Sequence, residues 1–213
     1  IKLIPPQNPK DIEELMSNLV DYINDPSLEE FDSLVKMAII HYQFESIHPF
    51  YDGNGRTGRI INILYLVLED LLEVPILYLS RYIIKHKSDY YKLLNEVSFN
   101  DGLNNWILFM LKGVEEIAKE TIETIKNIEN LMNETKNIIL EQKPKIYSKD
   151  LLEALFYHPY TKRAFIEEHL KVSRPTATNY LNELENLGIL SSKKIGKEIF
   201  YIHTNLFNLF KDM

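Results

Sequence analysis

Residues 48–59 read HPFYDGNGRTGR and bring several chemically useful side chains into twelve positions. His48 supplies an imidazole that can accept a proton near neutral pH. Asp52 supplies a single carboxylate, which is the usual protein ligand of a magnesium ion that also binds phosphate oxygens. Arg56 and Arg59 lie three positions apart, so both can project from one side of a helix turn and bind phosphate oxygens. These residue types in this order indicate a general base next to a phosphate-binding site.

The glycines of this segment favour the same interpretation. Gly53 and Gly55 flank Asn54 and lead into an apolar series over 60–71, which predicts a helix that is buried on nearly all sides. Unpaired amide groups at a helix N-terminus bind anions, and residues without Cβ let phosphate oxygens approach closely. We therefore expect the backbone of Gly53, Asn54 and Gly55 to form an anion cradle.

Each of these features also has a simpler explanation. A GNG sequence is more often a turn, a lone histidine is more often structural, and an arginine pair on a first turn is usually solvated. The functional interpretation depends on their occurring together and in order.

The segment resembles the Fic family signature, HxFx[D/E]GN[G/K]RxxR, at every specified position. The resemblance implies a helical core that transfers AMP from ATP, as co-substrate, to a Tyr, Thr or Ser hydroxyl of a target protein, the chain itself included. His48 would deprotonate that hydroxyl, and Asp52 would hold Mg²⁺ (or Mn²⁺). The resemblance implies ATP- or phosphate-binding roles for Asp52, Gly53, Asn54, Gly55, Arg56, Thr57, Gly58, Arg59, Tyr90 and Tyr91.

One position of the signature separates two reactions. Doc-type relatives, which phosphorylate their targets, carry lysine where this chain has Gly55. The resemblance therefore favours transfer of the adenylyl group over transfer of the γ-phosphoryl group.

Two further segments carry weaker resemblances. Leu3, Ile4 and Pro5 resemble the strand of the Fic flap, which pairs with an extended segment of the target. Tyr90 and Tyr91 resemble a tyrosine pair that flanks the nucleotide base. The alternative for the tyrosines is an aromatic pair on an amphipathic helix.

Periodicity and proline positions predict the secondary structure. In the N-terminal part, helices are expected over 11–24, 31–47, 56–72, 80–85, 88–99 and 106–141. In the C-terminal part, helices are expected over 148–157 and 160–170, then one capped by Ser173, followed by a strand pair turning at Gly196. We predict a mainly α fold, in which a Fic-type helical core with a short flap strand precedes a small α+β winged-helix domain. The expected divisions are 1–112 for the core with its flap, 113–145 for a connecting helix and 146–213 for the winged helix-turn-helix domain.

The C-terminal segment resembles the winged helix-turn-helix of transcription regulators. Residues expected to contact DNA or a protein partner are Arg174, Thr176, Lys193 and Lys194. From Ser148 onward, however, nine Lys and Arg face eight Asp and Glu, and Glu183 and Glu185 lie on the expected recognition helix. A duplex binder normally shows a clear basic face, so the charge balance favours a protein-contact module over DNA binding.

Composition limits the class of protein. The chain has 213 residues, a formal net charge of −7 and no cysteine, which excludes disulfides and favours a cytoplasmic location. No apolar run has membrane-spanning length, and usage rich in Ile, Lys and Asn suggests a bacterial source. The long helix and the appended module favour a homodimer. The main alternative function is a DNA-binding regulator that uses the nucleotide pocket as a sensor, although a sensor would have no use for His48 as a base.

Overall fold

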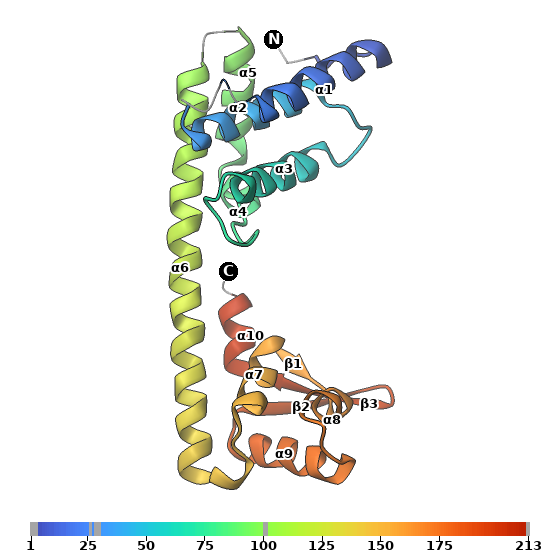
Figure 1. The fold of residues 1–213 in the computed structure, drawn as a ribbon, viewed down its shortest axis with the longest axis vertical. Coiled ribbons are helices and arrows are strands. Elements are labelled where there is room, and N and C mark those ends of the chain that lie inside the picture. Colours follow the sequence, from blue (N-terminus) through green and yellow to red (C-terminus); the bar gives the residue numbers. More distant parts are fainter. Residues whose placement is uncertain (1–3, 26, 28–30, 100–101, 212–213) are drawn as a thin grey trace. The chain divides into compact units, whose positions relative to one another are not determined.

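The structure is a computed structural model and describes residues 4–25, 27, 31–99 and 102–211. The chain divides into two compact units, Ile1–Thr121 and Ile122–Met213. Helix α6 (Leu103–Gln142) begins in the first unit and ends in the second (Figure 1). This helix confirms the long helix that was expected over 106–141.

The first unit is helical throughout its described elements. Before α6 these are α1 (Pro9–Asn24), α2 (Ser33–Ile47), α3 (Asn54–Leu68), α4 (Ser80–Lys85) and α5 (Lys87–Phe99). Asn8 caps α1 and Asp32 caps α2, each through a side-chain oxygen that accepts backbone N–H groups. The predicted helices are therefore confirmed, with boundaries shifted by up to four residues.

Helix α2 is the central element of this unit. Met37, Ala38, Ile40 and Phe44 are all 1 % exposed or less, because neighbouring helices cover α2 on several sides. Trp106 of α6 is fully buried against α2, and its indole N–H donates to the carbonyl of Ala38 at 2.8 Å. Burial of these large side chains fixes α2, and with it the segment that follows Ile47.

Helix α3 is less buried than its sequence predicted. Its inner side packs on α2 through Gly58, Asn62 and Tyr65, whereas Ile60, Leu64 and Leu68 are 56–63 % exposed. The prediction of a helix buried on nearly all sides was therefore wrong for α3. An apolar series shows that a helix can be buried, but not how many neighbours the fold provides.

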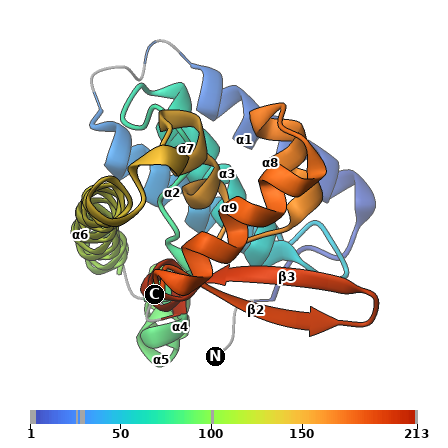
Figure 2. The same cartoon turned by 90° about the horizontal axis from the view of Figure 1, so that it is seen from below.

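The second unit is a small α+β domain. After a 3-10 turn (η2, Pro144–Ile146), its elements are α7 (Lys149–Tyr157), β1 (Tyr160–Thr161), α8 (Arg163–Leu170), α9 (Arg174–Asn186), β2 (Leu190–Ile195), β3 (Glu198–His203) and α10 (Thr204–Lys211). The sheet is antiparallel with strand order β1-β3-β2. Figure 2 shows β2 and β3 as a hairpin beside α9. The hairpin turns at Gly196, whose positive φ of 62° suits glycine.

The core of the second unit fixes its helices on the sheet. Leu151 of α7, Ile166 of α8 and Leu181 of α9 are fully buried, together with Ile139 from the end of α6. Ser173 caps α9 as predicted, since its hydroxyl accepts from the Thr176 amide. The helix expected over 160–170 begins only at Arg163, because Tyr160 and Thr161 pair with β3 instead.

Two further expectations concern the ends of the first unit. Leu3 lies outside the described residues, and Ile4 and Pro5 belong to no strand in the part of the chain that the structure describes. The short flap strand is therefore not seen over 4–7, where no described strand lies alongside to pair with it. None of the helices described is both long enough and apolar enough to cross a bilayer.

Candidate active site

His48 ends α2 in an unusual backbone conformation. Its φ and ψ are 52° and 54°, in the left-handed region, and its N–H donates to the carbonyl of Phe44 at 3.0 Å. A non-glycine residue in this region is uncommon and marks a position where the surrounding fold determines the geometry. The turn leaves His48 exposed, on the wall of a pocket of about 530 Å³ that Pro5, Pro6, Pro49 and Phe50 also line.

The side chain of Asn54 holds the loop between α2 and α3. Its Oδ1 accepts the backbone N–H of Phe50 at 2.9 Å, and its Nδ2 donates to the carbonyl of Phe50 at 2.6 Å. Asn54 is only 2 % exposed. The side-chain amide thus pairs with the Phe50 backbone as a neighbouring strand would, and it closes the loop that carries Asp52. The sequence predicted Asn54 as a part of the anion cradle but did not reveal this clamp.

The N-terminus of α3 is open to an anion. Gly53 occupies the N-cap with φ 86° and no side chain caps the helix, while the first backbone bond runs from the Thr57 amide to the carbonyl of Gly53. The amides of Asn54, Gly55 and Arg56 consequently have no acceptor among the described residues. Three such amides at the positive end of a helix dipole are a physical basis for binding a phosphate group.

Asp52 and Arg56 meet at the mouth of this cradle. Arg56 Nη2 lies 3.1 Å from Asp52 Oδ2, and Asp52 Oδ1 accepts the Gly53 amide at 2.7 Å. Both side chains are largely exposed, so the ion pair contributes only about 0–1 kcal/mol and leaves each partner free to bind a ligand. The pair holds a carboxylate and a guanidinium next to the free amides.

Arg59 is held differently from Arg56. Its Nε donates to Ser80 Oγ at 2.6 Å, and its guanidinium passes close to Gly55. A Cβ at position 55 would lie 3.2 Å from Arg59 Nη1, which is tighter than ordinary contact. Glycine at position 55 therefore leaves room for Arg59, in addition to letting an anion approach the amides. Ser80 is a positioning residue that the sequence did not suggest.

A layer of buried polar side chains lies between α2 and α3. His41 is fully buried, with Nε2 3.0 Å from the hydroxyl of Tyr90, and burial lowers the pKa of His41 to about 4. Glu45 is 8 % exposed and its Oε1 has no hydrogen-bond partner among the described residues. Burial raises the pKa of Glu45, opposed by the nearby charges of His48 and Arg59. Polar residues on the otherwise apolar α2 were the signal that could have revealed this layer.

Gly58 belongs to this layer and faces α2. A Cβ at position 58 would lie 2.8 Å from Glu45 Oε1 and 3.2 Å from His41, so glycine is needed there for the two helices to pack. Gly58 was predicted among the phosphate-binding residues, and in the structure it lies at the close contact between α2 and α3.

The variant Gly58→Ala is expected to lower the free energy of unfolding by about 1–3 kcal/mol, because the new methyl group overpacks the contact with Glu45. Urea denaturation measures the change. In a Glu45→Ala background the same substitution should cost clearly less, since the obstructing atom is gone. Equal costs in both backgrounds would contradict this assignment.

Two more predicted site residues, Tyr90 and Tyr91, belong to α5, and a third, Thr57, belongs to the first turn of α3. Tyr90 is 3 % exposed, and its hydroxyl lies 3.0 Å from His41 Nε2, while its role beside a nucleotide base stays a prediction. Tyr91 is 53 % exposed and packs edge-on against Tyr90. The Thr57 hydroxyl donates to the carbonyl of Gly53 at 3.1 Å and so steadies the N-cap. The alternative considered for the tyrosines, an aromatic pair on an amphipathic helix, describes Tyr90 better.

The predicted contact residues of the second unit fall on two elements. Arg174 and Thr176 lie in the first turn of α9, and the Thr176 hydroxyl is 2.9 Å from Ser173 Oγ. Lys193 and Lys194 are exposed on β2.

Family models match both units. Residues 3–66, which include the loop, match the Fic/DOC family, and residues 131–206 match the family described as protein adenylyltransferase SoFic-like, C-terminal domain. Over residues 3–66, the chain is therefore similar to a Fic domain. The loop at 48–59 lies within the first matched range, and the second matched range lies in the second unit.

Similar proteins are named as adenylyltransferases. Protein adenylyltransferase fic-1 of Caenorhabditis elegans is 26 % identical over 145 residues, which cover 68 % of this chain and 27 % of that protein. Protein adenylyltransferase Fic of Nematostella vectensis is 31 % identical over 112 residues, covering 53 % of this chain and 24 % of that protein. The chain thus spans about a quarter of the length of these relatives.

The fold is also similar to a solved structure. A Fic family protein from Desulfovibrio desulfuricans superposes with a TM-score of 0.50 and 22 % identity, over 93 % of this chain and 56 % of that one. The likeness confirms a mainly α Fic fold.

Proposed function

We propose that this chain is a protein adenylyltransferase, which moves AMP from ATP onto a hydroxyl side chain of a target protein. The observation that carries the proposal is the open N-terminus of α3, with three free amides, six residues after His48. The Fic domain and the names of the relatives support the same reaction.

The target hydroxyl oxygen bonds to the α-phosphorus of ATP while the bond between that phosphorus and the oxygen bridging to the β-phosphate breaks. The hydroxyl proton passes to the His48 imidazole, and pyrophosphate leaves with the electron pair of the broken bond. The amides of Asn54, Gly55 and Arg56 stabilise charge on the phosphoryl oxygens, which is where charge is spread in such a transition state.

The arginines would bind the outer phosphates. The Arg56 guanidinium is exposed beside Asp52 and can move onto an oxygen of the β- or γ-phosphate. The Arg59 guanidinium is fixed by Ser80, so it is preorganised for the γ-phosphate.

Asp52 fits a magnesium ion, or a manganese ion in its place. Its carboxylate is 92 % exposed, and each oxygen uses one lone pair for a described bond and keeps another for a cation. The ion would neutralise phosphate charge and orient the nucleotide when it is bound. Because a divalent ion at such a site takes its other ligands from phosphates and water, one protein carboxylate is sufficient.

The pocket beside His48 suits the target segment. Pro5 and Pro6 line one part of it, while His48, Pro49 and half-exposed Phe50 line another. A peptide bound between Pro5 and Pro6 on one side and Phe50 on the other would bring its hydroxyl to His48. This supports Pro5, which lines the pocket, as a target-docking residue, with Ile4 next to it in the chain.

We also propose the wider setting that the sequence suggested: a division into 1–112, 113–145 and 146–213, with the last segment a winged helix-turn-helix, in a cytoplasmic bacterial protein. The order of three helices, α7 to α9, before a two-stranded hairpin supports the winged-helix assignment. The exposed row of Ile60, Leu64 and Leu68 on α3 supports a homodimer.

The reaction is tested by the position of the label. Incubation of the chain with magnesium and ATP labelled at the α-phosphate should label protein, whereas ATP labelled at the γ-phosphate should not. The ratio of the two signals is measured after denaturing electrophoresis. Label from the γ-position alone would show phosphoryl transfer and would overturn the proposal.

A further inference from the structure

A carboxylate is buried beneath the first turn of α3. Glu45 of α2 is only 8 % exposed, and its Oε1 has no hydrogen-bond partner among the described residues. A Cβ at position 58 would lie 2.8 Å from this oxygen, and a Cβ at position 55 would lie 3.8 Å from it. Glu45 Oε1 therefore lies on the inner side of the helix turn whose backbone amides are open to an anion.

Arg59 shares this space with Glu45. A Cβ at position 55 would also lie 3.2 Å from Arg59 Nη1, so the guanidinium and Glu45 Oε1 approach the same point beside Gly55. The Nε of Arg59 donates to Ser80 Oγ, and no hydrogen bond joins Arg59 to Glu45 in the described part of the chain. The guanidinium thus stabilises the negative charge of Glu45 through space, and its terminal N–H groups stay available to a phosphate.

Burial and charge act on Glu45 in opposite directions. Burial raises the pKa of this carboxyl group, whereas the charges of His48 and Arg59 lower it. The other titratable groups around it are His41, whose pKa burial lowers to about 4, and Tyr90, whose pKa is raised by burial and by the charge of Glu45 itself. Because His41 is neutral near pH 7, the ionisation of Glu45 depends on the positive charges of His48 and Arg59.

A bound polyphosphate would change this balance. Its oxygens would accept from the open amides of α3 and from Arg59, so the guanidinium charge would be neutralised by phosphate. The phosphate would also bring negative charge to the same helix turn that covers Glu45. Two anions that share a site disfavour each other's ionised form, and the carboxylate can remove the repulsion by binding a proton.

We propose that Glu45 is a positioning residue that couples ATP binding to the uptake of a proton, which its carboxylate binds when phosphates neutralise Arg59. In the free protein the ionised carboxylate keeps the guanidinium near the cradle, and in the complex the neutral carboxyl group no longer competes for it. This inference rests on the proposed function, because it requires the phosphates of ATP at the N-terminus of α3. Such coupling is reciprocal, so the affinity for ATP should rise as the pH falls.

Proton uptake is measured by isothermal titration calorimetry of the whole chain with magnesium and an ATP analogue that cannot be cleaved between the α- and β-phosphorus. The slope of the binding enthalpy against the ionisation enthalpy of the buffer gives the number of protons bound, at a series of pH values from mild acid to neutral. The unchanged chain should take up more protons than Glu45→Gln, by at most one, because glutamine has a similar shape but does not titrate. Protons exchanged by His48 and by the nucleotide occur in both proteins and cancel in the difference.

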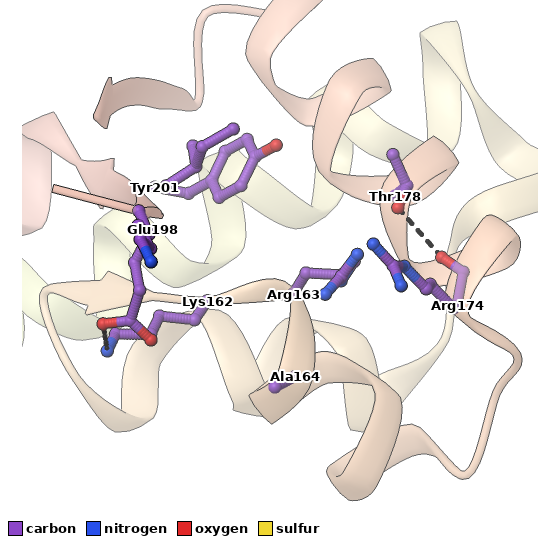
Figure 3. Close-up of a pocket in the computed structure, with 9 residues that line it drawn as sticks. Lys162, Arg163, Ala164, Arg174, Thr178, Glu198 and Tyr201 are labelled. Atoms are coloured by element: carbon purple, nitrogen blue, oxygen red, sulfur yellow. Dashed lines mark hydrogen bonds and ion pairs between the residues drawn. The ribbon is translucent and has the colours of Figure 1, made fainter. Parts of the chain in front are cut away.

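The variant Glu45→Gln should also bind the nucleotide about tenfold more tightly near neutral pH, which is the factor that corresponds to a pKa change of one unit. Its affinity should depend less on pH than that of the unchanged chain. The matched control is Glu198→Gln, which removes a carboxylate of the second unit that pairs with Lys162 at 2.7 Å (Figure 3). This control should bind as many protons, and the nucleotide as tightly, as the unchanged chain.

Equal proton uptake by the unchanged chain and Glu45→Gln, with nucleotide bound to both, would overturn the role of Glu45 and leave the proposed AMP transfer standing. Absence of nucleotide binding to the unchanged chain would overturn both. If circular dichroism shows that Glu45→Gln does not fold, the unchanged chain still decides. The pKa of the Glu45 carboxyl group, followed by NMR of its carboxyl carbon, should be higher with nucleotide than without, and equal values would overturn the proposal.

Discussion

The variant His48→Ala is expected to lower the rate of AMP transfer by about 10²- to 10⁴-fold, which is the usual contribution of a positioned general base. The affinity for ATP with magnesium should change little. His48 is exposed at the end of α2 and no described residue depends on its ring for a hydrogen bond, so the fold should tolerate its loss. Single-turnover transfer of α-labelled ATP measures the rate, and calorimetry measures the affinity.

The control for this variant is His169→Ala, which removes an exposed imidazole from α8 in the other unit. Its transfer rate should match that of the unchanged chain. If His48→Ala and His169→Ala transferred AMP equally fast, His48 would not be the base. If His48→Ala lost ATP affinity to the same extent as rate, His48 would act in binding and not in proton transfer.

The second unit is expected to lose stability in mild acid because of His203. This side chain is 2 % exposed, its Nδ1 accepts the Leu206 amide at 3.4 Å, and its Nε2 has no partner among the described residues. Burial lowers the pKa of His203 to about 4. In the unfolded chain the same imidazole takes up a proton below about pH 6.5. Burial of the neutral His203 ring therefore costs no stability above that pH. As the pH falls toward 4, the unfolded chain binds a proton that the folded chain does not, and the free energy of unfolding decreases by up to about 3 kcal/mol.

The variant His203→Asn should remove most of this pH dependence, because its Oδ1 can still accept the Leu206 amide but does not titrate. It should also be less stable near pH 7, since the edge-on contact with Phe156 is lost. Hydrogen exchange of peptides from β3 and α10, followed by mass spectrometry, reports the second unit separately. Peptides of α2 should keep their own dependence, because His41 remains buried there. An unchanged slope in the β3 peptides would contradict the role given to His203.

Most of the loop at 48–59 could be predicted because its geometry is local. The glycines, Pro49 and the apolar series after Arg59 fix where α2 ends and where α3 begins, so His48 and the amide cradle follow from spacing alone. Ser173 and Gly196 are similar cases, since a cap and a turn depend on a few adjacent residues.

The features that escaped prediction depend on contacts between distant segments. Tyr90 is buried because His41, 49 positions earlier, offers a polar partner. Ser80 fixes Arg59 across 21 positions. The strand at Tyr160 exists only because β3, about 40 positions later, pairs with it. Neither periodicity nor propensity carries information about such partners.

The contacts of Glu183 and Glu185 are a similar case. Lys143 lies 2.7 Å from Glu183, and the Ser192 amide donates to Glu185 at 2.8 Å. A count of charges along the sequence could not show which elements these two carboxylates contact, because only the fold brings the partners together.

The proposed function requires that the N-terminus of α3 binds the phosphates of ATP next to His48. NMR tests this requirement most directly. Amide chemical shifts are recorded during titration with magnesium and an ATP analogue in which a methylene group replaces the oxygen between the α- and β-phosphorus, so that the bond cannot be hydrolysed. We expect the amides of Asn54, Gly55 and Arg56 to shift together and with one Kd, accompanied by the His48 ring signals. Shifts confined to other segments, or unchanged amides at saturating nucleotide, would contradict the account.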